Sequence, residues 1–296
     1  MTPRKLNLLI ATFSYGGNGG IRSEVPDVRN YLCQLLLHLK NDPRIGEVHE
    51  GEFADTPLTM CRNKAVLTAR QWNCDLLLMI DSDMKPDMDV GVQPEAKPFW
   101  DTSFDFLYRH YDRGPVVIGA PYCGPPPVEN VYVFRWRFLQ NDNPNDDALK
   151  LDQYMREEAA ERSGIEQVAA LPTGLILFDM RAFELTEPKV DGDKPWFFYE
   201  YTDRHETQKA STEDVTATRE IAFHGQLQLG YNPIHVNWDA WAGHWKPKLV
   251  GKPRLLSQDA VSDKYTRAVH ALPADKRRHY VKTSAADGEW EGVPRG

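Results

Sequence analysis

A short apolar run that ends in two acids constrains this chain more than any other feature. Leu76 to Ile80 are five apolar residues in a row, and Asp81, Ser82 and Asp83 follow directly. An apolar run of this length, closed by polar residues, is typical of a strand buried on both faces of a parallel sheet. The sequence therefore predicts an α/β fold with a mostly parallel central sheet and helices on both faces.

The two acids after this run predict a metal site. Side chains two apart on extended backbone point the same way, so we expect Asp81 and Asp83 to present two carboxylates together. Ligands of open α/β sheets bind at the carboxyl ends of the strands. Two converging carboxylates with little neutralising charge nearby favour a divalent cation. The alternative is a solvated turn, since turns often carry acids.

Predicted strands and helices alternate through the first half of the chain. We expect strands at 6–12, 48–53, 76–80 and 116–120, separated by helices that begin near Pro26, begin near Pro57 and end at Gly114. The first helix has a wide apolar face made of Val28, Tyr31, Leu32, Leu35, Leu36 and Leu39. In the second helix, Arg62 is expected to lie off the buried stripe. This order is that of a doubly wound sheet.

The second half is predicted to be less regular. We expect a strand at 131–138, a polar loop at 141–147, a charged helix at 149–162, strands at 166–171 and 175–178, an extended aromatic segment at 195–199, a helix from 214 to 229 and a strand at 233–237. Gly230 is a typical residue to close the late helix.

Size and composition limit the class of protein. At 296 residues, the chain can form one large α/β domain or one domain with an appendage. Its net charge of -8 argues against a general nucleic-acid binder. No apolar run approaches the roughly 20 residues of a membrane span, and the four cysteines form no CxxC pair. We therefore expect a soluble cytoplasmic protein.

Three sequence blocks, in order, resemble those of a known enzyme family. They are CRNKAVLTARQWNCDLLLMIDSDM at 61–84, LPTGLILFDMRAFE at 171–184 and STEDV at 211–215. A glycine-rich stretch at 16–20 precedes them, and Gly243-His244 follows them. Across 6–244, the chain resembles the nucleotide-diphospho-sugar glycosyltransferases of the GT-A fold, especially the family 2-like group. Each block alone is common, whereas their order and spacing together are fairly specific.

The resemblance implies a metal-dependent transfer of a sugar from a nucleotide-diphosphate donor. In such enzymes the Asp-x-Asp pair holds Mn²⁺ or Mg²⁺ against the donor diphosphate, and the cation stabilises the leaving group as a Lewis acid. Asp83 would be the direct ligand, and Asp81 would serve the ribose or the metal through water. His244 is placed to be a third ligand, unless it is a loop histidine packed between Trp241 and Trp245.

The acidic block would supply the catalytic base. By resemblance Asp214, beside Glu213, takes the proton from the acceptor hydroxyl as it attacks the anomeric carbon. Such a reaction inverts the anomeric centre, although retaining enzymes share the wider fold. Both acids could instead only complement the dipole of the helix that they open.

The remaining site residues divide between donor and acceptor. The resemblance implies a donor site formed by Ala11, Thr12, Arg62, Asp81, Ser82 and Gly174. Trp196 and Tyr199 could form an acceptor wall, because aromatic faces stack on sugars or bases. An aromatic cluster is more often core, and an arginine such as Arg62 is often in a weak surface ion pair.

The predicted glycosyltransferase domain spans 1–247 and has two halves. Residues 1–127 would bind the nucleotide sugar, and 128–247 would carry the base and the acceptor site. A polar, basic extension follows at 248–296. Its charge contrasts with the acidic body and suggests an anionic acceptor such as hydroxymethylated DNA. A basic surface tail without a partner is the alternative.

Other classes of protein share parts of this pattern. Haloacid-dehalogenase-like phosphatases also carry Asp-x-Asp after an apolar strand, with the first aspartate as nucleophile. Here the motif lies on a late strand and lacks their usual Thr or Val. A non-catalytic binder of nucleotide sugars would keep the fold without needing Asp214. A Rossmann-type methyltransferase fits less well, because its cofactor has no diphosphate and would give Asp83 no metal to hold.

Overall fold

A computed structural model of the chain was analysed. It describes residues 4–14, 25–54, 57–126, 128–139, 148–190, 192–202, 205 and 208–245, together with short strands at 249–250, 281–283 and 290–292. The chain divides into two compact units, Met1–Pro253 and Arg254–Gly296. In the second unit, β15 (Val281–Thr283) pairs antiparallel with β16 (Trp290–Gly292). The predicted glycine-rich stretch and the loop at 141–147 lie outside the described residues.

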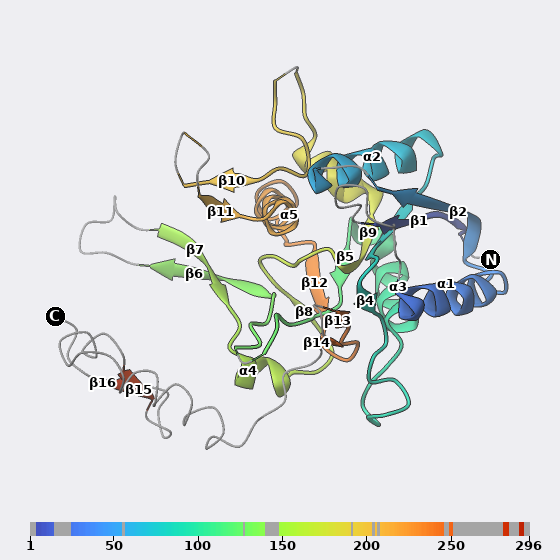
Figure 1. Cartoon of the computed structure of the whole chain (residues 1–296). Helices are drawn as coiled ribbons and strands as arrows, with labels where there is room; N and C mark the ends of the chain where they lie inside the picture. The colour runs from blue at the N-terminus through green and yellow to red at the C-terminus, as the bar shows by residue number, and fades with distance from the viewer. Residues whose placement is uncertain are drawn as a thin grey trace. The chain divides into compact units, whose positions relative to one another are not determined.

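The first unit is built on a seven-stranded, mostly parallel sheet, which confirms the predicted α/β class (Figure 1). The strand order is β2-β1-β3-β9-β5-β12-β8. These strands are β1 (Leu6–Phe13), β2 (Ile45–Phe53), β3 (Leu76–Asp81), β5 (Val117–Gly119), β8 (Ile165–Gln167), β9 (Leu175–Asp179) and β12 (Ile234–Asn237). Only β9 and β8 run against the other strands of this sheet.

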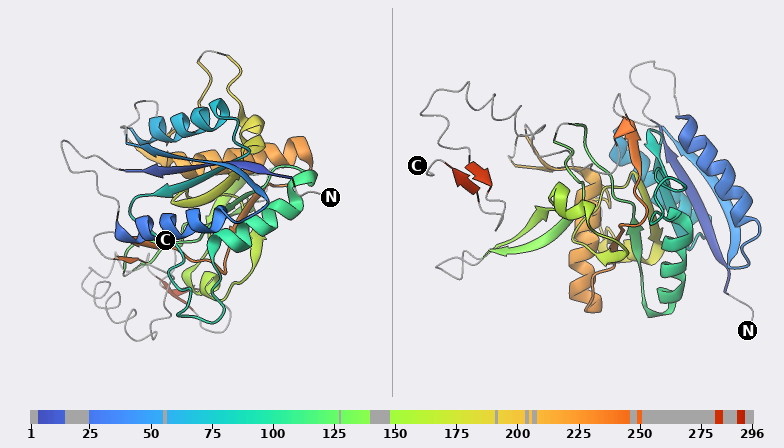
Figure 2. Two further views of the ribbon diagram at one scale, coloured as in Figure 1. Left: turned by 90° about the vertical axis from the view of Figure 1, so that its right-hand side faces the viewer. Right: turned by 90° about the horizontal axis from the view of Figure 1, so that it is seen from below.

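Helices cover both faces of the sheet. Figure 2 shows α1 (Pro26–Leu39) and α3 (Phe99–His110) on one face, with α2 (Leu58–Gln71) and α5 (Glu213–Leu229) on the other. Two short 3₁₀ helices, η1 (Tyr111–Arg113) and η3 (Met180–Thr186), follow α3 and β9. No helix in the described ranges has the length and apolar content to cross a membrane.

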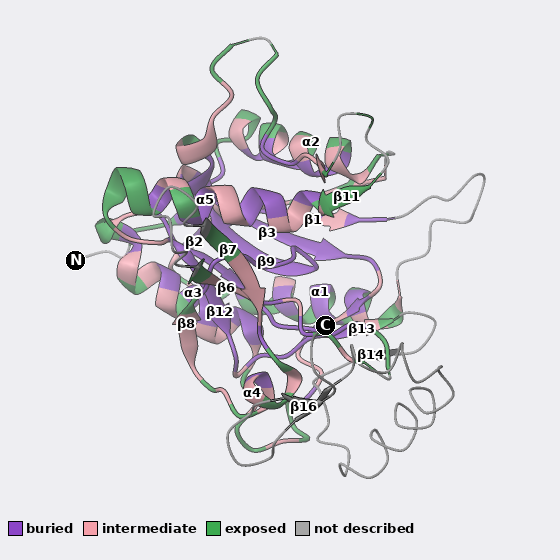
Figure 3. Ribbon diagram, turned by 90° about the vertical axis from the view of Figure 1, so that its left-hand side faces the viewer, coloured by how far each residue is buried: buried purple, intermediate pink, exposed green. Residues whose placement is uncertain are grey.

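The apolar run in β3 is buried as predicted. Leu76 to Ile80 have no exposed surface, and β3 lies between β1 and β9 (Figure 3). Burying a side chain such as leucine stabilises a fold by about 1.5–3 kcal/mol relative to leaving it exposed. The predicted face of α1 is also buried at Val28, Tyr31, Leu32, Leu35 and Leu39. These runs fix which faces of the elements meet.

The charged helix predicted at 149–162 is wrong. The first residues of that range belong to β7 (Ala148–Gln153), which pairs antiparallel with β6 (Phe134–Leu139), and only α4 (Arg156–Ala160) is helical. Leu149 and Leu151 alternate with polar residues, which is the period of a strand. The cross-strand pair of Trp136 and Leu151 decides between strand and helix, and Trp136 lies outside the segment 149–162 itself.

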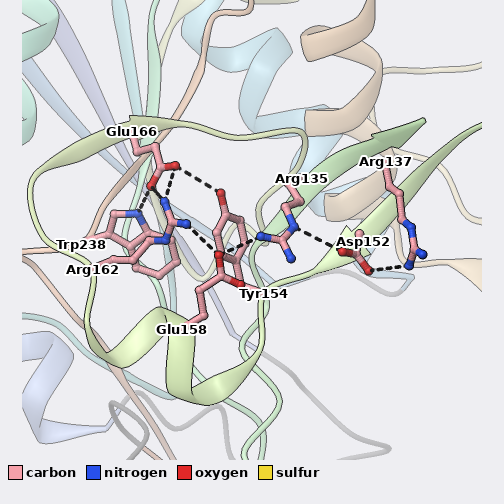
Figure 4. A network of polar contacts seen from close by, with 8 residues as sticks. All are labelled: Arg135, Arg137, Asp152, Tyr154, Glu158, Arg162, Glu166 and Trp238. Atoms are coloured by element: carbon pink, nitrogen blue, oxygen red, sulfur yellow. Dashed lines mark hydrogen bonds and ion pairs between the residues drawn. The ribbon is translucent and has the colours of Figure 1, made fainter. Parts of the chain in front are cut away.

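A network of ion pairs connects the antiparallel pair of β6 and β7 to β8, at the edge of the sheet (Figure 4). The ring of Tyr154 lies between two guanidinium groups, those of Arg135 and Arg162, at 5.0 and 4.9 Å. Glu166 on β8 accepts from Arg162 at 2.6 Å and from the indole nitrogen of Trp238 at 2.9 Å. The network therefore anchors Trp238, where the chain leaves β12 toward the site.

Three further small strand pairings belong to the described part of the first unit. The described pieces are β4 (Met84–Lys85), β10 (Glu200–Tyr201), β11 (Lys209–Ser211), β13 (Gly243–Trp245) and β14 (Leu249–Val250). β13 lies between β14 and β4, and β10 pairs with β11. The antiparallel pairing of β13 with β4 brings the end of the first unit back to the residues that follow β3.

A half-buried acid, Asp87, caps α3. The Oδ1 atom of Asp87 accepts a hydrogen bond from the backbone N–H of Phe99 at 2.6 Å. This bond favours the ionised carboxyl, but burial outweighs it and raises the pKa of Asp87 to about 6, from an ordinary value of 3.8.

We expect Asp87→Asn to remove a pH dependence of stability. Because the folded-state pKa is raised, this group's contribution is full below about pH 4 and is lost as the pH rises through about 6, by at most about 3 kcal/mol. Thermal unfolding between about pH 4 and 7 checks this. The midpoint of the variant should rise relative to wild type across that range, and a constant difference would contradict the assignment.

Candidate active site at the carboxyl end of the central strands

The candidate site lies where β1 and β3 end. Asp81 is the last residue of β3 and is in register with Phe13, the last residue of β1. The backbone N–H of Asp81 donates to the carbonyl of Gly174 at 2.9 Å, and that of Ser82 donates to the carbonyl of Phe13 at 2.9 Å. The chain then turns, so Asp83 no longer continues the strand.

Arg62 on α2 is buried against Asp81, which corrects the prediction that it lies off the buried stripe. Only 1% of Arg62 is exposed. Its Nη2 lies 3.1 and 3.2 Å from the two carboxylate oxygens of Asp81, and its Nε lies 3.4 Å from Oε1 of Glu213. Its guanidinium also lies over the ring of Phe13 at 4.9 Å. An arginine can be buried here because acids from two other elements neutralise it.

Four acids act on one another around this arginine. Burial raises the pKa of Asp81, Arg62 opposes this, and the charges of Asp83 and Asp214 raise it further. Burial and the charge of Asp214 likewise raise the pKa of Glu213. The ends of β3 and the start of α5 thus form one acidic region, in which additional positive charge would be stabilised.

Asp83 meets His244, as the predicted metal site requires of these two residues. The Nε2 atom of His244 lies 3.2 Å from Oδ2 of Asp83. The backbone N–H of Trp245 donates to the carbonyl of Asp83 at 2.9 Å, which fixes the two segments together. The ring of Tyr122 packs edge-on against His244 at 5.2 Å. Within the described part of the chain, the Nδ1 atom of His244 has no hydrogen-bond partner.

The two aspartates face different partners. Asp81 contacts Arg62, whereas Asp83 contacts His244. The sequence predicted that both carboxylates point the same way, but this holds only on extended backbone, and β3 ends at Asp81. Among the described residues, no group of three or more His, Cys, Asp or Glu side chains is arranged to hold a metal ion. Asp83 and His244 are therefore a two-residue donor set beside Asp81.

Asp214 lies in the first turn of α5, next to the loop before β9. Its Oδ2 accepts from the backbone N–H of Thr173 at 3.4 Å, and its Oδ1 accepts from that of Val215 at 2.8 Å. The Thr212 side chain, at the N-cap position, makes no capping hydrogen bond. The α5 start therefore holds Glu213 toward Arg62 and Asp214 toward Thr173.

The two predicted acceptor residues, Trp196 and Tyr199, lie in different environments. Trp196 is 7% exposed, and its indole nitrogen donates to the carbonyl of Phe183 at 3.1 Å, so it packs in the core. Tyr199 is only partly buried, and the Nζ of Lys209 lies 3.6 Å from the centre of its ring. Burial and the nearby Glu213 raise the pKa of Tyr199 to about 12. Of the two aromatic residues, Tyr199 is the one beside the acidic region.

A cavity of about 290 Å³ lies beside the site between β1, β2 and α1. The predicted donor residues Thr12 and Ser82 line it. Ala11 does not line it, because its side chain belongs to the core on the opposite face of the sheet. The rest of the lining is Ile10, Ser14, Arg29, Leu32, Glu50, Gly51 and Glu52, none of which the sequence singled out. A strand carrying acids at alternate positions near its end was the available signal.

Gly174 is required by close packing. A Cβ atom at this position would lie 2.8 Å from the hydroxyl of Tyr122 and 2.9 Å from the sulfur of Met84. The carbonyl of Gly174 holds Asp81, and Tyr122 packs on His244. This glycine therefore lets three parts of the site approach one another.

The comparisons with known proteins show no family. No family model matches the chain, and no curated protein matches it either. Among solved structures, A197 from STIV covers 86% of this chain and 97% of its own length, at 13% identity and a TM-score of 0.46. A Bacillus anthracis protein described as a glucose-1-phosphate thymidylyltransferase covers 80% and 89%, at 8% identity and 0.37. An apo UDP-glucose pyrophosphorylase covers 88% and 81%, at 11% and 0.30. Similarities this weak do not decide between enzyme classes.

We expect Gly174→Ala to destabilise the fold by about 1–3 kcal/mol, the usual range for overpacking. The added methyl must displace Tyr122 or Met84, both of which are buried. Thermal unfolding measures the loss. Made in a Tyr122→Ala background, where the ring contact is gone, Gly174→Ala should lower the midpoint by less than it does in wild type, and an equal loss in the two backgrounds would contradict this cause.

Proposed function

We propose that this protein is a metal-dependent glycosyltransferase of the GT-A fold, which moves a sugar from a nucleotide-diphosphate donor to an acceptor hydroxyl. One observation carries the proposal. Asp81, Asp83, Glu213 and Asp214 gather at the carboxyl end of the central strands beside a cavity, with Arg62 buried among them. An acidic region at this place suits a cation and the groups that it binds.

The cavity is the proposed site of the nucleoside. Thr12, Ser14 and Ser82 supply hydroxyl groups to it, and Glu50 and Glu52 supply carboxylates. The hydroxyl of Ser14 donates to Oε1 of Glu52 at 2.8 Å, which holds that carboxylate near the end of β2. These acceptors suit the N–H and O–H groups of a base and a ribose rather than a phosphate, whose charge they would repel. The diphosphate would then extend toward Asp83.

The side chains of Asp83 and His244 fit a divalent cation. A carboxylate beside an imidazole suits Mn²⁺ and, less well, Mg²⁺. The Nε2 atom of His244 lies 3.2 Å from Asp83, so the imidazole is already oriented toward that carboxylate, and its Nδ1 atom has no hydrogen-bond partner among the described residues. A bound cation would neutralise charge on the departing diphosphate as a Lewis acid. Asp81, held by Arg62, would add negative charge to this position or contact the ribose.

Asp214 is the proposed base. The acceptor oxygen forms its bond to the anomeric carbon as the bond to the diphosphate breaks, and its proton passes to the carboxylate of Asp214. The hydrogen bonds from Thr173 and Val215 orient that carboxylate without protonating it. Glu213 is buried against Arg62, so we assign it support of Asp214 rather than proton transfer. Attack from the face opposite the diphosphate would invert the anomeric centre.

The acceptor would approach past Tyr199. Its ring can stack on a sugar or a base, and Lys209 beside it would favour an acceptor that carries negative charge. Hydroxymethylated DNA remains one such candidate. The predicted boundary between the glycosyltransferase domain, 1–247, and the basic extension, 248–296, stays part of this proposal.

Contacts of Asp81 argue against the phosphatase alternative. A nucleophilic aspartate needs a carboxylate oxygen free to attack phosphorus. Both oxygens of Asp81 contact Arg62, and 6% of the residue is exposed. A non-catalytic binder is distinguished by the behaviour of Asp214.

We expect Asp83→Asn to abolish stabilisation by Mn²⁺ and a nucleotide. A ligand bound only to the folded chain raises its thermal midpoint, so Mn²⁺ with UDP, GDP or dTDP should raise that of wild type. His244→Gln should weaken the rise, and His224→Gln, at a partly buried histidine on α5 that lies 3.7 Å from Glu220, should leave it unchanged. A full rise in Asp83→Asn would sink the metal assignment.

We expect Asp214→Asn to bind the donor yet lose transfer by about 10²-fold or more, the usual contribution of a positioned base. With water as the acceptor hydroxyl, release of nucleoside diphosphate from UDP-glucose, GDP-mannose or dTDP-glucose measures turnover, and thermal shift measures binding. Glu220→Gln, further along α5, is the matched control. Turnover at the wild-type rate in Asp214→Asn would exclude this base, and the absence of turnover in wild type would favour a binder.

A further inference from the structure

Arg62 joins two elements that are far apart in sequence. Its Nη2 contacts Asp81 at the end of β3, and its Nε contacts Glu213 at the start of α5. The sheet strands β5, β8 and β9 lie between Asp81 and Glu213 along the chain, yet one guanidinium contacts both acids. Arg62 belongs to α2, so three elements meet at this group.

The surroundings of Arg62 leave it little freedom. It is 1% exposed, and one face of its guanidinium lies over the ring of Phe13. Asp81 and Glu213 are also buried, at 6% and 4% exposed. A planar guanidinium can contact two carboxylates through different nitrogens at once, whereas the single ammonium of lysine cannot reproduce that geometry. The contact therefore fixes direction as well as charge.

The contact reaches the reacting groups through the backbone. Glu213 and Asp214 are consecutive residues in the first turn of α5. The contact of Arg62 with Glu213 therefore also fixes the position of Asp214. Asp214 contacts the loop at Thr173, and Gly174 in that loop holds the N–H of Asp81. A closed circuit of contacts thus runs from Arg62 through Glu213, Asp214 and the loop back to Asp81.

We propose that Arg62 is a positioning residue that aligns the Asp214 base with the donor site by holding Asp81 and Glu213 together. This inference rests on the proposed glycosyltransferase function and differs from the predicted role of Arg62 as a donor contact. A donor contact would change donor affinity, whereas a positioning residue changes the rate of the bound complex.

Arg181 provides a matched control. Its Nε lies 3.0 and 3.1 Å from the oxygens of Asp179, which is fully buried, and its guanidinium lies 3.9 Å from the ring centre of Tyr111. Like Arg62, it therefore combines a buried carboxylate with an aromatic ring. Asp179 ends β9 in register with Leu76, the first residue of β3, so this pair lies at the other end of the strands.

The test compares Arg62→Lys with Arg181→Lys. Both variants should lower the thermal midpoint, Arg62→Lys by more, because 1% of the Arg62 side chain is exposed against 35% of that of Arg181. Arg62→Lys should lower kcat by about 10²-fold, the cost of a small misplacement of a reacting group, and leave the donor KM within about threefold of wild type. Arg181→Lys should retain the wild-type kcat. Turnover is read from nucleoside diphosphate released from UDP-glucose, GDP-mannose or dTDP-glucose with Mn²⁺.

A second variant guards against failure to fold. Arg62→Met leaves buried carboxylates without a counter-charge, so Arg62→Met combined with Glu213→Gln should be more stable than Arg62→Met alone. The pair should still have the low kcat, because the two contacts act as one unit.

Each other outcome overturns the inference. A rise in donor KM with unchanged kcat in Arg62→Lys would make Arg62 a donor contact, and equal loss of kcat in Arg181→Lys would make the role merely structural. If the wild-type protein turns over a donor, either of these two outcomes overturns only the role of Arg62, and the glycosyltransferase proposal is unaffected. Absence of wild-type turnover with all three donors would overturn both proposals together.

Discussion

The buried contact of Arg62 with Asp81 and Glu213 is the interaction on which the rest of the site depends. A carboxylate in a protein interior is strongly destabilising unless a positive charge and hydrogen bonds compensate it. Here a single cation serves two acids, and two further acids lie close enough to raise their pKa values. The region is thus held in a state of excess negative charge, which packing of α2 and α5 on the sheet maintains.

Local patterns were sufficient to predict most of the framework. The uninterrupted run in β3 and the 3.6-residue period of α1 each define which face is buried, and each occurs within one short segment. The helix predicted at 149–162 was wrong because the segment carries charged residues three and four positions apart, a spacing that is typical of a helix. Glu158 and Arg162 are one such pair. Its first half forms a strand only because Trp136 and its neighbours pair with it. Pairing between distant segments is not written in either segment alone.

The candidate site was predictable in part for the same reason. Asp83 and His244 are 161 positions apart, and only the order of blocks along the chain suggested that they meet. The structure brings them together through β4 and β13. Arg62 could not be predicted as buried, because its neighbours on α2 give no sign of the acids that neutralise it. Glu50 and Glu52 were missed because acids on an outer strand usually face solvent.

The reversed direction of β9 has a consequence for the architecture of the site. Each parallel strand of this sheet ends at the edge that carries the candidate site and contributes there the loop that follows it. Because β9 starts opposite Ile80, its leading turn arrives at that edge instead. Backbone amide and carbonyl groups of Thr173 and Gly174 are thereby inserted among the acids. The antiparallel direction of β9 thus places the loop that precedes a strand beside the loops that follow β1 and β3.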